Sequence, residues 1–558
     1  MSLFFRNVSF SQIPSTLLLD DSGFTVFTSS VDTRIVYVSN AGNDSWNGLA
    51  SSFVSGSVGP KSTILNGKTL IRDTYPDWLL LKRGDTFTES GILWATNGRS
   101  STEPQLLGTY GTGDRPLIQT GSSNFLNQQY GNTCNYIAVV GLHLIPHIYA
   151  ISGTPLIPGG PVGIEWDHDY IWFLLEDCFI EKYWQNFVSQ GTTNLNEHTG
   201  VYCSSLIMRR NIIVDAFSTL DTEMQVNTGI YLNTINVVLL EENIFEHNGW
   251  RTDISGTLPS WFRHNGYIQN GVLNVTVKNN IWTGTDTVMC RAGGTIVGNL
   301  SVNNYLGFLI GLGIDPEPGG VSALMYDNVT ISACEYGNGG PYPPTFLAGG
   351  LAMDIGNISS MRAYNNIWMH SGSATGERGI GMREQVGAYA QYRIVHDTII
   401  SGNIFYDWGG TAFQISDNSA ALAQQNLTLS VVDNHVFNNK DTGYMVTHNM
   451  GEDLSGVTAS NNAFSGLANS ASWFRVSGVD KTLSQWKALL TPPDTTSQAS
   501  ALSYPNPNRT IESYMASLGQ TATYGNFTSK LREMRKGNWD TNYTALIINS
   551  YFRAGFGR

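Results

Sequence analysis

This 558-residue chain is poor in charge, and above all in positive charge. Only 13% of its residues are charged, with 31 Lys and Arg against 44 Asp and Glu, and the formal net charge is −13. A surface that binds nucleic acid needs clustered Lys and Arg, and the sequence contains no such run. The charge balance therefore argues against a nucleic-acid partner and favours a protein that meets sugars.

Paired cysteines and long apolar segments are also missing. The five cysteines stand far apart without a Cys-x-x-Cys pair, which indicates neither a zinc site nor a disulfide framework: Cys134, Cys178, Cys203, Cys290 and Cys334. We expect buried thiols, no metal and no cofactor. No stretch approaches a transmembrane span, and the apolar patch before Arg6 is too short for a signal sequence. We therefore expect no membrane insertion and no export by a signal peptide.

What the chain does contain is a repeated phrase, in which Asn is followed by an aliphatic or small residue and then by an aromatic residue or Val. The copies begin at Asn211, Asn243, Asn280, Asn366, Asn403, Asn434 and Asn462, with looser copies at Asn299 and Asn328. Subtracting neighbouring positions gives steps from 19 residues (280 to 299) to 38 residues (328 to 366). A repeat length that varies in this way indicates stacked coils joined by loops of variable length.

Each copy lies in a run of alternating polar and apolar residues, as in Asn274 to Trp282, which is typical of a strand with one buried face. An Asn at a fixed corner can adopt the left-handed conformation and bond neighbouring backbone, so stacked coils are expected to align their Asn side chains into a ladder. The apolar residues after it are expected to fill the interior. Because one such unit cannot bury its apolar side alone, the pattern predicts an all-β solenoid of roughly ten to twelve coils.

A β-sandwich or a propeller is the competing interpretation. Sandwiches show no recurring phrase of this kind, and propeller blades repeat at a steadier length with their own marks. We expect a lead-in segment over residues 1–35, the solenoid over 36–480 and a helical region over 481–558. A short helix near Thr63–Ile71 is expected to cap the open first coil, and the C-terminal helices are expected to dock on the last coils.

The Asn phrases, the opening Tyr37-Val38-Ser39 and the Arg83–Phe87 turn together resemble the right-handed parallel β-helix proteins of the pectate-lyase-like superfamily. Within it, Phe245–Trp250, Arg263–Gln269 and Cys290–Gly294 are similar to a subset from bacteria and phage tailspike depolymerases. The resemblance covers roughly residues 36 to 470. It implies a right-handed parallel β-helix, a polysaccharide laid in a groove along the strands and, for tailspikes, a homotrimer. It is less specific for chemistry, because this fold hosts lyases, hydrolases and inert binders.

The segment from Asp221 to Arg291 is the richest in reactive side chains, and parallel stacking brings residues one coil apart to within about 5 Å. In a hydrolase, two carboxylates flank the glycosidic bond, with Glu223 and Glu246 as first choices and Asp221 in reserve. In a lyase, a base removes the proton next to a uronate carboxylate and a cation neutralises the developing charge. The sequence leaves both mechanisms open, and the lyase candidates are His264 or Tyr267 as the base and Arg291 as the cation.

Candidate sugar-binding residues are Trp250, Arg251, Arg383, Glu384 and Trp408. Each candidate also has a purely structural explanation. Glu246 suits a solvated corner, His264 a satisfied bond to a neighbouring coil, and Trp408 the closure of a loop. Tyr267 belongs to the core if the strand register shifts by one residue. Arg291 before a glycine pair is the hardest to explain by packing, whereas Glu165–Asp169 shows too few oxygens for calcium.

These observations lead us to expect an extracellular polysaccharide depolymerase that cuts a capsular polysaccharide, an exopolysaccharide or an O-antigen, most like a phage or prophage tailspike in the virion tail. One alternative is a secreted bacterial pectate- or alginate-type lyase. Another is a non-catalytic carbohydrate-binding fibre or adhesin, which needs an aromatic groove but no acid cluster.

Overall fold

A computed structural model describes most of the chain. The described residues are 17–128, 133–152, 159–191, 203–218, 226–251, 262–311, 319–332, 351–370, 378–383, 395–408, 411–416, 427–438, 444–448, 454–467 and 469–558. Three predicted site residues, Asp221, Glu223 and Glu384, and also Cys334, lie outside these ranges.

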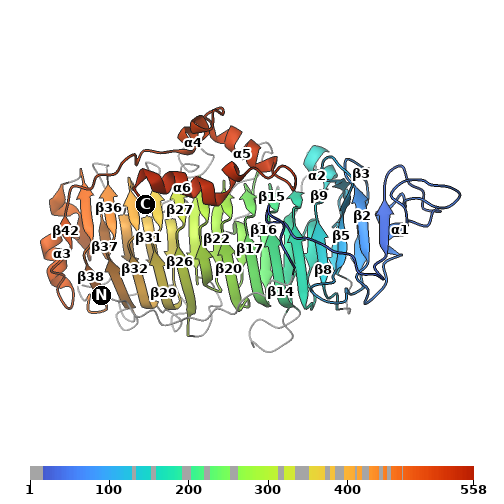
Figure 1. Ribbon diagram of the computed structural model, residues 1–558. Helices are drawn as coiled ribbons and strands as arrows, with labels where there is room; N and C mark the ends of the chain where they lie inside the picture. The colour runs from blue at the N-terminus through green and yellow to red at the C-terminus, as the bar shows by residue number, and fades with distance from the viewer. Residues whose placement is uncertain are drawn as a thin grey trace.

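The chain winds into a parallel β-solenoid with three long sheets, and Figure 1 shows the strands stacked side by side into a rod. Every strand pairs in parallel with the strand one coil further along, except for the antiparallel pair at the end of the second sheet, which joins β40 (Phe474–Val476) to β41 (Val479–Lys481). This confirms the predicted fold class. Each sheet has 14 strands, so the solenoid is longer than the ten to twelve coils predicted.

Sheet I consists of β1 (Ile35–Val38), β2 (Trp78–Lys82), β5 (Gln105–Tyr110), β8 (Ile137–Val140), β11 (Trp172–Glu176), β14 (Cys203–Arg209), β17 (Ile235–Glu241), β20 (Asn274–Lys278), β23 (Gly294–Val297), β26 (Val321–Tyr326), β29 (Ile358–Tyr364), β32 (Val395–Ser401), β35 (Leu427–Val432) and β38 (Val457–Ser460). Sheet II consists of β4 (Ile92–Trp94), β7 (Leu126–Gln128), β10 (Val162–Trp166), β13 (Gln185–Gln190), β16 (Asn227–Asn233), β19 (Arg263–Ile268), β22 (Asp286–Cys290), β25 (Leu306–Ile310), β28 (Leu351–Ile355), β31 (Arg378–Arg383), β34 (Thr411–Ser416), β37 (Val446–His448), β40 and β41. Sheet III consists of β3 (Thr86–Phe87), β6 (Leu117–Gln119), β9 (His143–Ile145), β12 (Phe179–Glu181), β15 (Ile212–Val214), β18 (Ile244–Glu246), β21 (Ile281–Thr283), β24 (Leu300–Val302), β27 (Val329–Ile331), β30 (Ile367–Met369), β33 (Ile404–Tyr406), β36 (His435–Asn438), β39 (Ala463–Gly466) and β42 (Gln498–Ala499).

The repeated Asn forms a buried ladder at the corner between sheets I and III. Each Asn donates from Nδ2 to the Oδ1 of the Asn on the next coil, as from Asn243 to Asn280 at 3.0 Å and from Asn280 to Asn299 at 3.1 Å. The same Nδ2 also donates to a sheet I carbonyl one coil back, as from Asn280 to Leu240 at 2.9 Å. The ladder starts at the backbone N–H of Cys178 and ends on the Ser497 hydroxyl.

The left-handed residue at this corner is the one before the ladder Asn, which corrects the expectation that Asn itself takes this conformation. Arg210, Glu242, Asn279, Asp327, Asn365, Asp433 and Asn461 all have φ between 54° and 58°. Glycine fills the same position at Gly298 and Gly402. The ladder Asn is then free to turn its amide into the corner, where both of its polar groups find partners.

The two residues after each ladder Asn face opposite ways. The second residue fills the interior of the solenoid, where Phe245 and Trp282 stack at 4.1 Å. The first residue, such as Ile244 or Ile281, faces outward from sheet III and packs in a separate apolar cluster under the C-terminal helices. The expectation that the residues after Asn fill the interior therefore holds for only one of the two.

Helices close both ends of the rod and cover one side of it. At the first coil, α1 (Ile64–Lys68) buries Ile64 and Gly67 as predicted. At the last coil, α3 (Leu483–Leu489) stacks Trp486 on Phe474 at 4.8 Å. The other short helices are α2 (His147–Ser152), η4 (Ser470–Ser472) and η5 (Thr541–Tyr543).

The helices α4 (Ile511–Ser517), α5 (Tyr524–Arg532) and α6 (Ala545–Gly555) run along sheet III (Figure 1). The prediction that they dock on the last coils alone is wrong. The outward aliphatic row of sheet III, on which they pack, extends back to the middle of the rod. The chain just after α5 reaches Asp177, which accepts from the backbone N–H of Lys536 at 2.8 Å. No helix in the described part of the chain is long and apolar enough to cross a membrane.

Candidate active site

The candidate site lies on the outward face of sheet II, where β16, β19 and β22 are neighbours. The register pairs Tyr231 with Tyr267 and Tyr267 with Met289, so these side chains follow one another on consecutive coils. The interior row beside them contains Ile230, Ile268 and Val288. Alternation of inward and outward side chains along each strand therefore places Tyr267 on the outside and half-buried.

A buried His–Asp pair lies next to Tyr267. The Nδ1 of His264 is 2.5 Å from Oδ2 of Asp286, and its ring centroid is 5.1 Å from that of Tyr267. The other carboxylate oxygen of Asp286 accepts from the backbone N–H of Asn265 at 2.6 Å. Because both oxygens are engaged, Asp286 fixes the orientation of the imidazole and directs proton exchange to Nε2.

An Asn row at the corner between sheets III and II holds this pair in place. Asn248 donates to Oδ1 of Asn265 at 2.9 Å, and Asn265 donates to the carbonyl of Asp286 at 2.6 Å. All three side chains are fully buried. The bond from Asn265 to Asp286 ties β19 to β22. The backbone of two adjacent coils therefore sets the distance between His264 and Asp286.

Arg291 contributes a positive charge without an acidic partner among the described residues. Its guanidinium carbon is 5.0 Å from the centroid of the Tyr267 ring, and its Nη1 donates to Oε1 of Gln269 at 3.2 Å. Its Nε is buried without a hydrogen-bond acceptor in the described structure. Among the described residues its neighbours are neutral and leave the charge uncompensated, which suits the binding of an anionic group of a ligand.

Tyr267 is held between two flat groups. On one side its ring stacks on Tyr231, with centroids 5.7 Å apart and an angle of 10° between the planes. The Arg291 guanidinium lies over the same ring. Stacking and the cation hold the ring, and the hydroxyl lies 3.5 Å from the Gln269 side-chain amide. The arrangement fixes a phenol beside an imidazole and a cation.

Glu246, in contrast, lies on sheet III and is turned away from this group. Its Oε2 accepts from Nε of Arg532 at 2.6 Å, and Arg532 also donates to Asp215 at 2.7 Å. Burial raises the pKa of Glu246, and the nearby charge of Asp215 adds to this effect, while Arg532 opposes it. Burial also favours a raised pKa for Asp215, but the hydrogen bond from His247 and the charge of Arg532 hold that pKa well below its usual range.

Three of the remaining predicted residues have buried side chains. Trp250 is 3% exposed and donates to the Gly284 carbonyl at 3.3 Å. Arg251 is buried with its guanidinium over Phe217. Trp408 is 1% exposed within the main core, a position that does not favour sugar stacking. Arg383 ends β31, and the placement of its side chain is outside the described part of the structure.

Sequence reasoning brought His264, Tyr267 and Arg291 together and missed Asp286, Gln269 and Tyr231. Asp286 stands 22 residues after His264. This spacing is one coil in a part of the solenoid where the ladder step from Asn280 to Asn299 is only 19 residues. A coil length measured locally, rather than as an average, is the signal that could have found Asp286.

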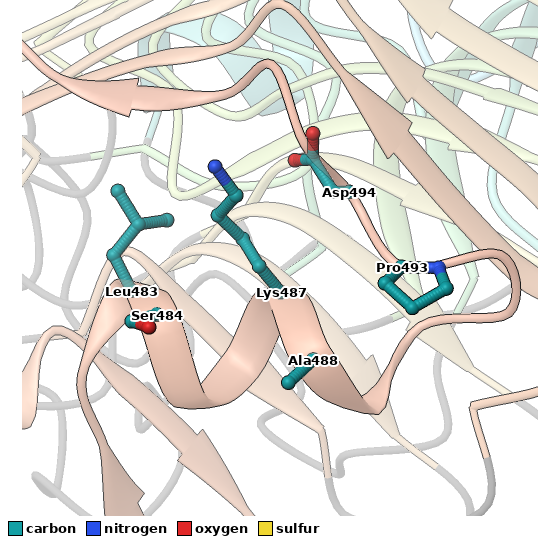
Figure 2. A pocket seen from close by; sticks show the side chains of 6 residues that line it. All are labelled: Leu483, Ser484, Lys487, Ala488, Pro493 and Asp494. Atoms are coloured by element: carbon teal, nitrogen blue, oxygen red, sulfur yellow. The ribbon is translucent and has the colours of Figure 1, made fainter.

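Elsewhere, the described residues offer a hollow at the end of the solenoid but no metal site. A hollow of about 430 Å³ lies beside α3, where Lys487 and Asp494 face each other across the helix and the loop that follows it (Figure 2). Lys487 donates to the Ser497 carbonyl at 2.5 Å and Asp494 accepts from the backbone of Thr496 and Ser497, so both charges serve the end cap. No group of His, Cys, Asp and Glu suited to a metal ion occurs among the described residues.

Comparisons with known proteins give a likeness in structure alone. No protein-family model matches the chain, and no curated protein matches its sequence. A crystal structure of the GH136 lacto-N-biosidase from Eubacterium ramulus, a selenomethionine derivative, is similar at 12% identity and a TM-score of 0.30, covering 84% of this chain and 68% of that one. The native form gives 12%, a TM-score of 0.35 and coverages of 74% and 65%. A rhamnogalacturonan lyase gives 12%, a TM-score of 0.28 and coverages of 77% and 87%. Scores of this size carry no argument about activity.

Proposed function

We propose that this protein is a polysaccharide-degrading enzyme that cleaves an acidic polysaccharide by β-elimination on the outward face of sheet II. The observation that carries the proposal is the buried His264–Asp286 pair beside Tyr267, with an Arg291 that no described acid neutralises. Elimination at a uronate requires a base, an acid and a cation within reach of one sugar, and these side chains supply all three.

In this proposal the guanidinium of Arg291 binds the carboxylate of a uronic acid residue and stabilises the negative charge that develops on it. The neutral imidazole of His264 removes the proton on the carbon next to that carboxylate through Nε2, while Asp286 stabilises the imidazolium that forms.

The Tyr267 hydroxyl donates a proton to the glycosidic oxygen as the carbon–oxygen bond breaks, and a carbon–carbon double bond forms. Tyr267 then regains a proton from solvent and His264 loses one, which restores the site.

Hydrolysis by a carboxylate pair receives less support. Glu246 is engaged by Arg532 from α5, so its ion pair anchors the C-terminal helices to sheet III. Asp221 and Glu223 lie outside the described residues and stay predictions. Asp286 is bound to His264 and to the backbone of Asn265, which leaves it as a positioning group for the imidazole.

For the biological setting, we propose that the substrate is a bacterial surface polysaccharide and that the protein acts outside the cell as a homotrimeric depolymerase of a phage or prophage tail. The resemblance of Phe245–Trp250, Arg263–Gln269 and Cys290–Gly294 to a subset from bacteria and phage tailspike depolymerases supports this proposal. A secreted bacterial lyase that acts on pectate or alginate is the alternative, and the same site chemistry serves both.

The test is to incubate the protein with polygalacturonate, with alginate and with purified capsular polysaccharides, and to follow ultraviolet absorbance and reducing ends together. We expect absorbance from an unsaturated uronate on at least one of the acidic polymers. His264→Ala should abolish it, whereas His435→Gln on sheet III, which contacts Tyr504, serves as the matched control. New reducing ends without absorbance contradict elimination. Binding without cleavage favours a carbohydrate-binding fibre.

A further inference from the structure

The outward face of sheet II changes character on the two sides of the candidate site. Toward the N-terminal coils it presents half-buried polar side chains, namely Gln190, Tyr231 and Gln269. On the next coil toward the C-terminus it carries a buried apolar cluster, in which Tyr305, Leu306 and Leu309 are 4%, 1% and 4% exposed and Met289 packs against them. Among the described side chains of the coils next to the site, hydrogen-bonding groups for a polar ligand therefore lie mainly on the N-terminal side. Described polar side chains return to the same row further along, at Gln414, Thr447 and Arg475.

The polar side chains on the N-terminal side occupy equivalent positions on successive coils. The register pairs Gln190 with Asn233. The backbone N–H of Gln269 donates to the Leu232 carbonyl at 2.9 Å, and that of Arg291 donates to the Ile268 carbonyl at 2.9 Å, which extends the same ladder. Strands in a sheet lie about 4.8 Å apart, so Gln190, Asn233, Gln269 and Arg291 follow one another along the solenoid axis. Asn233 is only 3% exposed, so the half-buried Gln190, Gln269 and Arg291 are the members of this line that a ligand can meet.

This line suits a sugar chain better than it suits other ligands. A primary amide offers both a donor and an acceptor, which matches the mixed character of a sugar hydroxyl. Arg291 at one end of the line is already bonded to Gln269, so an anionic sugar at Arg291 has an amide as its next neighbour. Tyr231, half-buried behind Tyr267, adds an aromatic edge and a hydroxyl on the same side.

We propose, on the basis of the function proposed above, that the sugar chain extends from Arg291 toward the N-terminal coils and that Gln190 and Tyr231 form a binding subsite for it. The apolar cluster of Leu306 and Leu309 ends the polar row on the other side. The reacting sugar thus lies at the C-terminal end of the polar row.

The test compares Gln190→Ala with Arg475→Ala on short and long oligosaccharides prepared from the acidic polymer that the wild type cleaves. Arg475 is the matched control, because it lies in the same sheet toward the C-terminal end and pairs with Thr447. Losing one amide contact at the subsite should raise KM for the long fraction about fivefold to tenfold, with kcat, melting temperature and the short fraction unchanged. Arg475→Ala should behave like the wild type.

Equal KM values for Gln190→Ala and wild type on long chains, or a raised KM for Arg475→Ala alone, overturn the subsite. If the proposed function is wrong, the wild type cleaves neither fraction, so this outcome can be told apart from failure of the subsite alone. In that case affinity electrophoresis in gels containing polygalacturonate or alginate still reports on the subsite. Gln190→Ala should migrate faster than wild type through the gel that retards the wild type, and identical migration contradicts the proposal.

Discussion

Arg291 carries a positive charge that no described acid neutralises, in a chain whose formal net charge is −13. Most of the other described arginines in the solenoid are paired with carboxylates, as Arg72 is with Asp77 and Arg115 with Asp177. Retaining a half-buried charge beside an amide and a phenol is costly unless an anion arrives, because no acidic partner among the described residues offsets the desolvation of the guanidinium. At the scale of the residue, this is the strongest sign of a ligand.

Replacing Arg291 by Ala should therefore lower turnover at least tenfold and up to about a hundredfold, as the loss of a group that stabilises transition-state charge does. Its melting temperature should stay near that of the wild type, because the side chain has no ion pair to lose among the described residues. Steady-state kinetics and a thermal melt measure both quantities. Unchanged kcat and KM would falsify the role given to this cation.

Asp286 is expected to act through His264. Asp286→Asn keeps the shape of the side chain but loses its negative charge, so the imidazolium formed during proton removal is less stable and kcat should fall about a hundredfold or more. A purely structural role would lower the melting temperature without moving the pH profile. We expect the opposite, namely a shifted pH–rate profile with a small change in melting temperature.

The sequence could predict part of the site for a physical reason. His264, Tyr267 and Arg291 stand on two consecutive short coils of one sheet, so closeness in sequence and closeness in space agree. Glu246 was grouped with them because it is also near in sequence, but it is the third residue after the ladder residue Asn243, and this position faces the C-terminal helices. Asp286 was missed because its pairing with His264 depends on the register between coils.

At the scale of the element, the Asn ladder makes each coil depend on its neighbours. The side chain of Asn280 accepts from the backbone N–H and the Nδ2 of Asn243, and it donates to the Leu240 carbonyl and to Asn299. Its removal leaves several buried polar groups without partners, each of which costs about 1–3 kcal/mol.

Asn280→Ala should therefore lower the local stability of β17 and β20 by about 3 kcal/mol or more. Hydrogen exchange of the backbone amides in these strands measures the loss, since it reports opening of separate parts of a long structure. Asn274→Ala is the control, because Asn274 is a partly exposed residue of β20 whose side chain bonds to Asn236 in the described structure. Equal exchange in both variants contradicts a structural ladder.

The C-terminal helices are held to sheet III by a buried ion group. Arg532 contacts both Asp215 and Glu246, and Arg532→Ala leaves two buried carboxylates without their cation, at a cost of about 3 kcal/mol in the opening free energy of α5. Arg535→Ala, which removes an exposed pair with Asp114, should cost about 1 kcal/mol or less. Hydrogen exchange in α5 compares the two.

The pH dependence of this anchor follows from Asp215. The pKa of Asp215 in the folded protein lies well below its ordinary 3.8, so its stabilising contribution is complete above that ordinary value and is lost as pH falls through the lowered one. Glu246 acts in the opposite sense, because a raised pKa favours the folded state at acid pH. The part of the Arg532→Ala cost that comes from Asp215 should therefore persist at mildly acidic pH and shrink only in strongly acidic solution, whereas the part that comes from Glu246 shrinks earlier, as that carboxylate is protonated. Disappearance of the cost at mildly acidic pH contradicts this account.

At the scale of the whole molecule, the repeat in the sequence was enough to predict a solenoid but not its length. The coils before Asn211 have other residues at the ladder corner, such as Cys178, so counting Asn phrases underestimates the coils. The path of the C-terminal helices could not be predicted from periodicity either. It depends on the outward row of Ile212, Ile244 and Ile281, which looks like interior residues in the sequence.

The proposed trimer is a property of the whole molecule. The chain has a mass of 61.1 kDa, and we expect light scattering in solution to give about three times that mass, because the resemblance to tailspike depolymerases implies a homotrimer. The measurement should be repeated at high salt, since an assembly held by surface charge dissociates as charges are screened. A mass of one chain under both conditions contradicts the trimer and leaves the single-chain site unaffected.

The most direct test of the central claim is the ultraviolet absorbance of acidic polysaccharide incubated with the wild type and with His264→Ala. If the outward face of sheet II carries out β-elimination, the wild type produces absorbance from unsaturated uronate in step with new reducing ends, and His264→Ala produces neither at a temperature at which circular dichroism shows it to be folded. Depolymerisation without that absorbance, or full activity in a folded His264→Ala variant, contradicts the account.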